Sequence, residues 1–213
     1  MRYRLVAFDL DGTLLDTLED LADAVNATMR QFNLPTLTIE EVRSFVGDGI
    51  RLLLTRCANP YPFDEKMGAF MGETYAKHCQ DKTKPYDGIM PLLAALQEKG
   101  VQMAVLSNKP DFATKKLVEL YFGDYIRVAV GENEKAGVRK KPAPDALFAV
   151  MEQFGVAAKD TLYVGDSEVD IKTAKAAGVD CVSVLWGFKD RQFLQDNGGA
   201  TMIEKPAELL DIL

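Results

Sequence analysis

The chain has 213 residues, with 32 acidic and 25 basic side chains and a net charge of −7. This charge repels polyanions, and because the basic residues form no cluster, the sequence excludes nucleic acid as a partner. No apolar run approaches the roughly 20 residues that span a bilayer, and the first apolar run is too short for a signal peptide. We therefore expect a cytoplasmic protein without a membrane partner.

The cysteine and histidine content removes further classes of protein. Cys57, Cys79 and Cys181 are widely separated and form no Cys-x-x-Cys pair, which argues against a disulfide framework or a thiolate metal site. His78 is the only histidine, and the chain has no Gly-x-Ser-x-Gly motif, so a serine hydrolase or a histidine-based zinc site is disfavoured. The chemistry must use carboxylates, hydroxyls and lysines.

Short apolar runs predict the strands of a parallel sheet. The first, residues 4–8, is apolar without interruption from Leu5 to Phe8, as in strands that are buried on both faces. Similar runs follow at 102–106, 127–130, 161–164 and 181–185, with a weaker one at 201–203. Helical patterns at 90–99, 144–155 and 171–177 separate them. This alternation predicts an α/β fold with a doubly wound parallel sheet, a Rossmann-like core.

The interval between the first two strands is much longer than a crossover helix requires. Apolar residues recur at helical spacing over residues 18–32, and the capping-box pair Thr38 and Glu41 begins a second helix. Helical patterns return at 50–57 and 67–75. We therefore expect an all-helical cap domain, residues 16–85, inserted into a core domain of residues 1–15 and 86–213, with hinges near 14–17 and 83–88.

Four polar clusters accompany the ends of the predicted strands. They are Asp9-Leu10-Asp11-Gly12-Thr13, Ser107-Asn108-Lys109-Pro110, Lys140-Lys141-Pro142 and Gly165-Asp166-Ser167-Glu168-Val169-Asp170. Taken alone, the first three clusters are better explained as a helix cap, a turn and a solvated loop, and the fourth can also be explained as a helix cap. Their joint occurrence at the edge where open α/β sheets bind ligands predicts one shared site. Four converging carboxylates require a cation, and Mg²⁺ is the cation that prefers carboxylate and phosphate oxygens.

In residue type, order and spacing, the four clusters resemble the motifs of the haloacid dehalogenase-like hydrolases, over essentially the whole chain. The pattern is most similar to phosphoglycolate phosphatase-like members with a C1-type helical cap. The resemblance implies a Mg²⁺-dependent phosphatase that cleaves a small phosphorylated metabolite through an aspartyl-phosphate. It makes Asp9 the nucleophile, Asp11 the general acid and base, Ser107 a donor to the phosphoryl oxygens and Lys141 the neutralising cation.

The resemblance also implies the ligands of the metal and of the substrate. Mg²⁺ would be held by Asp9, the backbone carbonyl of Asp11, Asp166 and Asp170, the last directly or through water. Our candidate substrate-binding residues are Gly12, Thr13, Asn108, Gly47, Asp48, Gly49 and Arg51. We include the four cap residues, 47–49 and 51, because a glycine-bounded turn can approach a ligand closely and an arginine can pair with a substrate carboxylate. A helix-connecting turn with a surface arginine explains them equally well.

Several alternatives stay open or are disfavoured by particular residues. A phosphosugar mutase shares the paired aspartates, and a pyrophosphatase is a further candidate. Haloacid dehalogenation is disfavoured because Asp11 is present, and a receiver-like signalling domain is disfavoured by Asp11 and the inserted cap. Phosphoglycolate, pyrophosphate, sugar phosphates and nucleoside monophosphates are all candidate substrates. Both a monomer and a homodimer are compatible with the sequence.

Overall fold

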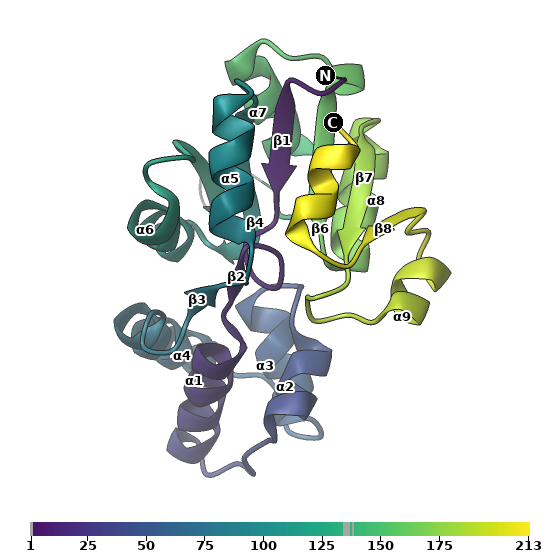
Figure 1. The fold of residues 1–213 in the computed structure, drawn as a ribbon. Coiled ribbons are helices and arrows are strands. Elements are labelled where there is room, and N and C mark those ends of the chain that lie inside the picture. Colours follow the sequence, from purple (N-terminus) through teal and green to yellow (C-terminus); the bar gives the residue numbers. More distant parts are fainter. Residues whose placement is uncertain (1, 134–136, 138) are drawn as a thin grey trace.

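The computed structural model describes residues 2–133, 137 and 139–213. Helices α1 to α4 gather at one end of the molecule, and the large sheet with the other helices lies at the opposite end (Figure 1). Both chain termini lie at the end of the sheet part that is far from α1 to α4.

The large sheet is parallel and has six strands in the order β5-β4-β1-β6-β7-β8. Chain order reverses at β1, since β4 and β5 lie on one side and β6, β7 and β8 on the other. Ligands bind at such a switch point in open α/β sheets, beyond the carboxyl ends of the strands. The strands are β1 (Leu5–Phe8), β4 (Gln102–Pro110), β5 (Val128–Glu132), β6 (Thr161–Gly165), β7 (Asp180–Val184) and β8 (Thr201–Ile203).

Successive residues of β1 pack into two different cores. Val6 and Phe8 belong to the core that includes α5 (Ile89–Glu98) and α6 (Asp111–Phe122). Leu5 and Ala7 belong to the core that includes α7 (Asp145–Phe154) and α8 (Glu168–Ala177). Because helices cover both faces, no position on the strand can be polar, which explains the uninterrupted apolar run. The predicted doubly wound α/β fold is confirmed.

One strand is longer than the sequence indicates. The apolar run predicted a strand over 102–106 followed by a turn, but β4 continues to Pro110. Its pairing with β5 is irregular between Leu106 and Pro110, and Pro110 then pairs with Glu132. The polar cluster 107–109 therefore lies within an irregular stretch of strand. Short elements complete the core: η2 (Ala158–Asp160), α9 (Arg191–Asp196) and η3 (Pro206–Asp211).

The insertion is helical, as expected. It contains α1 (Leu18–Gln31), α2 (Ile39–Phe45), α3 (Ile50–Ala58) and α4 (Glu65–His78). The predicted capping box begins α2, because Thr38 Oγ1 accepts from the Glu41 amide at 3.3 Å and Glu41 Oε2 accepts from the Thr38 amide at 2.7 Å. Buried side chains such as Met29 and Met71 fill the space between the helices. We call this group of helices the cap.

Two short strands join the cap to the core. β2 (Leu15–Asp16) and β3 (Lys84–Pro85) pair antiparallel, so the two connections run side by side. Of the domain boundaries that we propose, 1–15 and 86–213 for the core and 16–85 for the cap, one lies within β2 and the other at the end of β3. Across the described parts of the chain, none of the helices has the length and apolar character needed to cross a membrane.

Candidate active site

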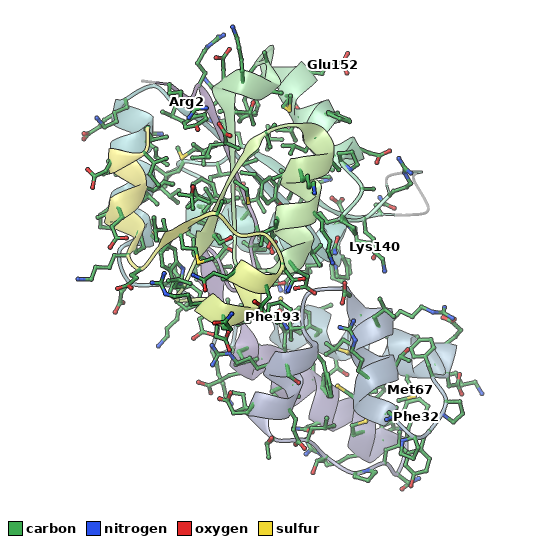
Figure 2. All side chains as sticks on the ribbon, turned by 90° about the vertical axis from the view of Figure 1, so that its right-hand side faces the viewer. Arg2, Phe32, Met67, Lys140, Glu152 and Phe193 are labelled. Atoms are coloured by element: carbon green, nitrogen blue, oxygen red, sulfur yellow. The ribbon has the colours of Figure 1, made fainter. Side chains whose placement is uncertain are left out.

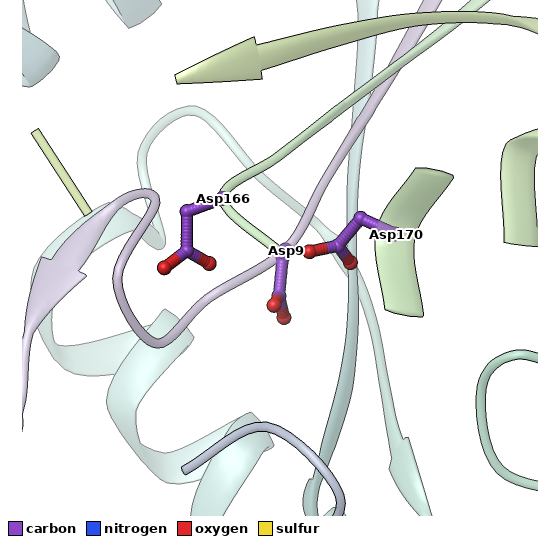
Figure 3. A group of neighbouring side chains, drawn as sticks. All are labelled: Asp9, Asp166 and Asp170. Carbon is purple, nitrogen blue, oxygen red and sulfur yellow. The ribbon is translucent and has the colours of Figure 1, made fainter. Parts of the chain in front are cut away.

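Three carboxylates converge at the carboxyl edge of the sheet. Asp9 follows β1, Asp166 follows β6, and Asp170 lies in the first turn of α8. Each offers an oxygen within 4.8 Å of the other two, and Figure 3 shows the three side chains together. The predicted convergence of the first and fourth clusters is thus present in the fold.

The charge of this group is unbalanced. Burial and the nearby Asp170 carboxylate raise the pKa of Asp9 to about 7 and raise the pKa of Asp166 well above its ordinary value. The Nζ of Lys141 lies 2.9 Å from Asp9 Oδ1 and 2.7 Å from Asp170 Oδ1. Burial disfavours its charged form, but the two carboxylates outweigh burial and hold the pKa of Lys141 well above its usual value. One ammonium cannot neutralise three carboxylates, and an all-oxygen group with excess negative charge fits a divalent cation such as Mg²⁺.

Asp170 is already fully engaged with protein donors. Its Oδ2 accepts from the Ser167 amide at 3.1 Å and from the Ser167 hydroxyl at 2.6 Å, which caps α8. Its Oδ1 accepts from Lys141 at 2.7 Å and from the Tyr163 hydroxyl at 3.3 Å. These bonds fix Asp170 as the group that positions Lys141 beside Asp9.

Two glycines let the backbone close around Asp166. The Phe188 amide donates to Asp166 Oδ2 at 2.7 Å, and Thr13 Oγ1 lies 3.5 Å from Oδ1. A Cβ atom on Gly12 would lie 2.3 Å from Asp166 Oδ2, and one on Gly187 would lie 2.3 Å from Asp166 Cβ. Any larger residue at either position would displace the carboxylate.

Asp11 lies beside this group and is held by two donors. The Thr17 hydroxyl donates to its Oδ1 at 2.8 Å, and Lys109 Nζ lies 2.8 Å from each of its oxygens. Lys109 also donates to the Tyr75 hydroxyl of α4 at 2.7 Å. Burial disfavours the charge on Lys109, yet Asp11 and Tyr75 keep its pKa above the usual value. Asp11 is therefore fixed between the chain leading to the cap and the end of β4.

Side-chain hydrogen bonds to main-chain carbonyls connect the cap to the core next to the site. Asn108 Nδ2 donates to the Gly47 carbonyl at 3.1 Å and to the Lys141 carbonyl at 3.0 Å. The Lys140 ammonium, at the boundary between core and cap (Figure 2), donates to the Asp48 carbonyl at 3.2 Å. Arg43 of α2 donates to the carbonyls of Gly187 and Phe188.

The cavity between core and cap has polar and apolar lining residues. Asp9, Asp11, Ser107 and Asp166 of the core line it, together with cap residues, among them Leu21, Val46, Gly47, Gly49, Ile50 and Leu53. This is an arrangement for a small ligand with an anionic reacting group.

A family comparison agrees with this geometry. The sequence profile described as "Haloacid dehalogenase-like hydrolase" matches residues 6–184, which include all four polar clusters and the cap. The chain is a haloacid dehalogenase-like hydrolase. The phosphoglycolate phosphatase of Pseudomonas syringae pv. tomato is 38% identical, over 99% of this chain and 77% of that protein. Phosphoglycolate phosphatase 1 of Pseudomonas aeruginosa is 36% identical, over 97% and 78%.

Solved structures of this family share the whole architecture. A structure from Lactobacillus delbrueckii subsp. bulgaricus superimposes with a TM-score of 0.90 at 33% identity, covering 100% of this chain and 98% of that one. The predicted family is confirmed, and so is the predicted class of enzyme, a phosphomonoester hydrolase similar to phosphoglycolate phosphatases.

Some predicted residues of this haloacid dehalogenase-like hydrolase do not reach the cavity. The side chain of Arg51 is 67% exposed, pairs with Glu65 and is not among the described residues that line the cavity. Asp48 pairs with Arg56 at 2.6 Å, so only its carbonyl faces the core. Gly12 and Thr13 contact Asp166, whereas Gly47 and Gly49 do line the cavity. The surface-arginine explanation of Arg51 is the one that the geometry favours.

Other residues of the site were missed from the sequence. Lys109 belongs to the second cluster, but it is inconspicuous there because the pattern suggests a turn. Tyr75 falls at a helical position typical of core packing, and Arg43 falls on a surface-like face of α2. Lys140 has no role in the resemblance, yet its ammonium contacts the cap loop. For Lys109, the position three residues beyond the apolar run of β4 is the only signal that the sequence offers.

We expect Gly187→Ala to lower activity about 10²-fold, because displacing a reacting group by about 1 Å costs that much. The added methyl would overlap Asp166 and the Gly12 carbonyl. Gly72→Ala in α4 is the matched control, since its Cβ would meet nothing within 4 Å, and alanine there should stabilise the helix by about 1 kcal/mol. Steady-state kinetics with thermal unfolding will test this. Equal activity of the two variants would contradict the role of the glycine.

Proposed function

We propose that this enzyme hydrolyses a small phosphomonoester of the phosphoglycolate type, with Mg²⁺, through an aspartyl-phosphate on Asp9. One observation carries the proposal, namely the position of Asp9 at the end of β1. There it faces the cavity between Lys141 and Asp11. The relatives that bear the name phosphoglycolate phosphatase support the choice of substrate.

The attacking atom would be Oδ2 of Asp9. The other oxygen, Oδ1, accepts from the Leu10 amide at 2.7 Å and lies 2.9 Å from Lys141. Attack on phosphorus transfers the phosphoryl group to Asp9 and divides hydrolysis into two easier steps. Lys141 and the Ser107 hydroxyl would stabilise the charge that spreads over the phosphoryl oxygens in the transition state.

Asp11 has the position for proton transfer in both steps. In the first step it would donate a proton to the leaving alkoxide, and in the second it would take a proton from the water that attacks the aspartyl-phosphate. A single group suffices because each step restores the protonation state that the other needs.

The residues that would hold Mg²⁺ are Asp9, the carbonyl of Asp11 and Asp166, with Asp170 beside them. The bound ion would supply positive charge against the phosphoryl oxygens and against the carboxylates that otherwise repel the substrate. Gly47 and Gly49 of the cap would contact the leaving group. The substrate-binding and metal-binding roles of all these residues are parts of the proposal.

We expect turnover of phosphoglycolate with Mg²⁺ and none in excess chelator. Mg²⁺ should also raise the thermal unfolding temperature, because it binds the folded chain and relieves repulsion among Asp9, Asp166 and Asp170. The rise should disappear in Asp166→Ala. Malachite-green phosphate release and a thermal shift series measure the two effects.

The same assay should include pyrophosphate, sugar phosphates and nucleoside monophosphates. Full turnover in excess chelator would refute the metal requirement. Exchange of phosphate within a hexose bisphosphate, without release, would identify a mutase instead.

A further inference from the structure

A buried chain of contacts links the cap to Asp11. Lys109 is 5% exposed and Tyr75 is 1% exposed, so water reaches neither group freely. The Lys109 ammonium contacts both oxygens of Asp11 at 2.8 Å and the Tyr75 hydroxyl at 2.7 Å. It also lies 4.5 Å from the centre of the Tyr75 ring. Asp11 and Lys109 belong to the core, whereas Tyr75 belongs to α4 of the cap.

The ammonium of Lys109 is directed at Asp11 and Tyr75. An ammonium group has three donor hydrogens and no acceptor. Lys109 donates to Asp11 Oδ2 and to the Tyr75 hydroxyl, and its Nζ also lies 2.8 Å from Asp11 Oδ1. Although Lys109 lines the cavity, the polar contacts of its ammonium within the described residues are to Asp11 and Tyr75. This distinguishes it from Lys141, which faces Asp9.

A buried ammonium is stable only when it is paired and hydrogen-bonded. Without Tyr75, one of its donors would be unsatisfied in an apolar space, and the ammonium would be free to shift. Because Asp11 is held by Lys109 on one side and by the Thr17 hydroxyl on the other, any shift of Lys109 would move the Asp11 carboxylate.

We infer that Lys109 and Tyr75 are positioning residues, which together hold Asp11 in the orientation for proton transfer when the cap lies on the core. The inference rests on the proposed acid and base role of Asp11. Neither residue exchanges a proton with substrate. Because Tyr75 belongs to the cap, Asp11 is fully aligned only when the cap lies on the core.

The test is Tyr75→Phe, which removes one hydroxyl and keeps the packed ring. A positioning role predicts that the loss depends on the leaving group, since an alkoxide needs a proton and p-nitrophenolate hardly does. We expect kcat/KM for an alkyl phosphate to fall about tenfold, a part of the roughly 10²- to 10⁴-fold that general acid–base catalysis contributes. With p-nitrophenyl phosphate, formation of the aspartyl-phosphate should change less than about twofold, because that step needs no proton from Asp11.

Tyr121→Phe is the matched control. The Tyr121 hydroxyl also makes one 2.7 Å bond near the junction of cap and core, to the Thr83 carbonyl, but it does not contact Asp11 or Lys109 in the structure. Tyr121→Phe should leave the ratio of the rates measured with the two substrates unchanged. An equal loss on both substrates in Tyr75→Phe, or a rise in KM alone, would overturn the inference, because the first indicates a folding role and the second substrate binding.

A double-mutant cycle separates this inference from the proposed function. If Tyr75 acts through Asp11, adding Tyr75→Phe to Asp11→Asn should produce no further loss with the alkyl phosphate. Additive losses would overturn the positioning role. If Asp11→Asn alone lowers activity equally with the alkyl phosphate and with p-nitrophenyl phosphate, then the proposed acid and base role of Asp11 itself is wrong.

Discussion

Lys141→Ala is expected to lower kcat about 10³-fold, the upper end of the loss seen when one donor to a charged transition state is removed. The ammonium of Lys141 bridges Asp9 and Asp170, and its side chain is 4% exposed. Its removal leaves the nucleophile without the cation that lies beside it and leaves two buried carboxylates facing each other. The folded state should also lose roughly 3–5 kcal/mol, the cost of breaking one side of a buried ion pair.

The neighbouring lysine provides the control. Within the described residues, Lys140 donates to the Asp48 carbonyl of the cap loop, so Lys140→Ala should change kcat less than about twofold, as substitutions outside buried networks do. Steady-state kinetics and urea unfolding of both variants distinguish the two lysines. Equal losses would mean that the third polar cluster has been assigned to the wrong lysine.

The architecture of the core could be predicted from the sequence, because strands that are buried on both faces are apolar at every position. The run at β1 is apolar at every position, and the helices are bounded by residues with strong end preferences, such as Thr38 with Glu41 at α2. The extension of β4 was not predictable. Its polar residues Ser107 to Lys109 resemble a turn, and only the irregular pairing with β5 keeps them in the strand.

The site was predictable to the extent that its residues follow strands of one sheet. Parallel strands end at the same edge, so the cluster at Asp9 and the cluster at Asp166 had to meet there, whatever the intervening chain does. The same argument cannot place cap residues. Arg51 met the chemical requirements of a substrate-binding residue, but whether it faces the cavity depends on how α3 rotates against the core.

Contacts between cap and core are hidden for a further physical reason. Arg43, Asn108 and Lys140 all donate to main-chain carbonyls across the boundary. A carbonyl is present at every residue, so the partner of such a donor has no identifying side chain. The pairing of Lys109 with Tyr75 is hidden in a different way, since tyrosine at a helical core position is ordinarily explained by packing alone.

Asp11→Asn is expected to lower turnover of alkyl phosphates about 10²- to 10⁴-fold, the contribution of general acid–base catalysis, while leaving the first step with p-nitrophenyl phosphate intact. The amide keeps the size of the side chain but can neither donate a carboxylic proton nor accept one from water. An alkoxide leaves only when protonated, whereas p-nitrophenolate leaves unaided, so Asp9 should still be phosphorylated by the activated ester. Lys141 and Asp166 are unchanged in the variant.

The second step should then stall, because no base activates water. A rapid-quench experiment should show a burst of p-nitrophenolate of about one equivalent per active site, followed by slow release. Intact-mass measurement should detect a phosphate adduct that hydroxylamine removes, and Asp9→Asn should show neither burst nor adduct. Steady, undiminished turnover of an alkyl phosphate by Asp11→Asn would exclude Asp11 as the acid and base. Since Lys109 and Thr17 both bind the Asp11 side chain, that outcome would leave the three residues with a structural role only.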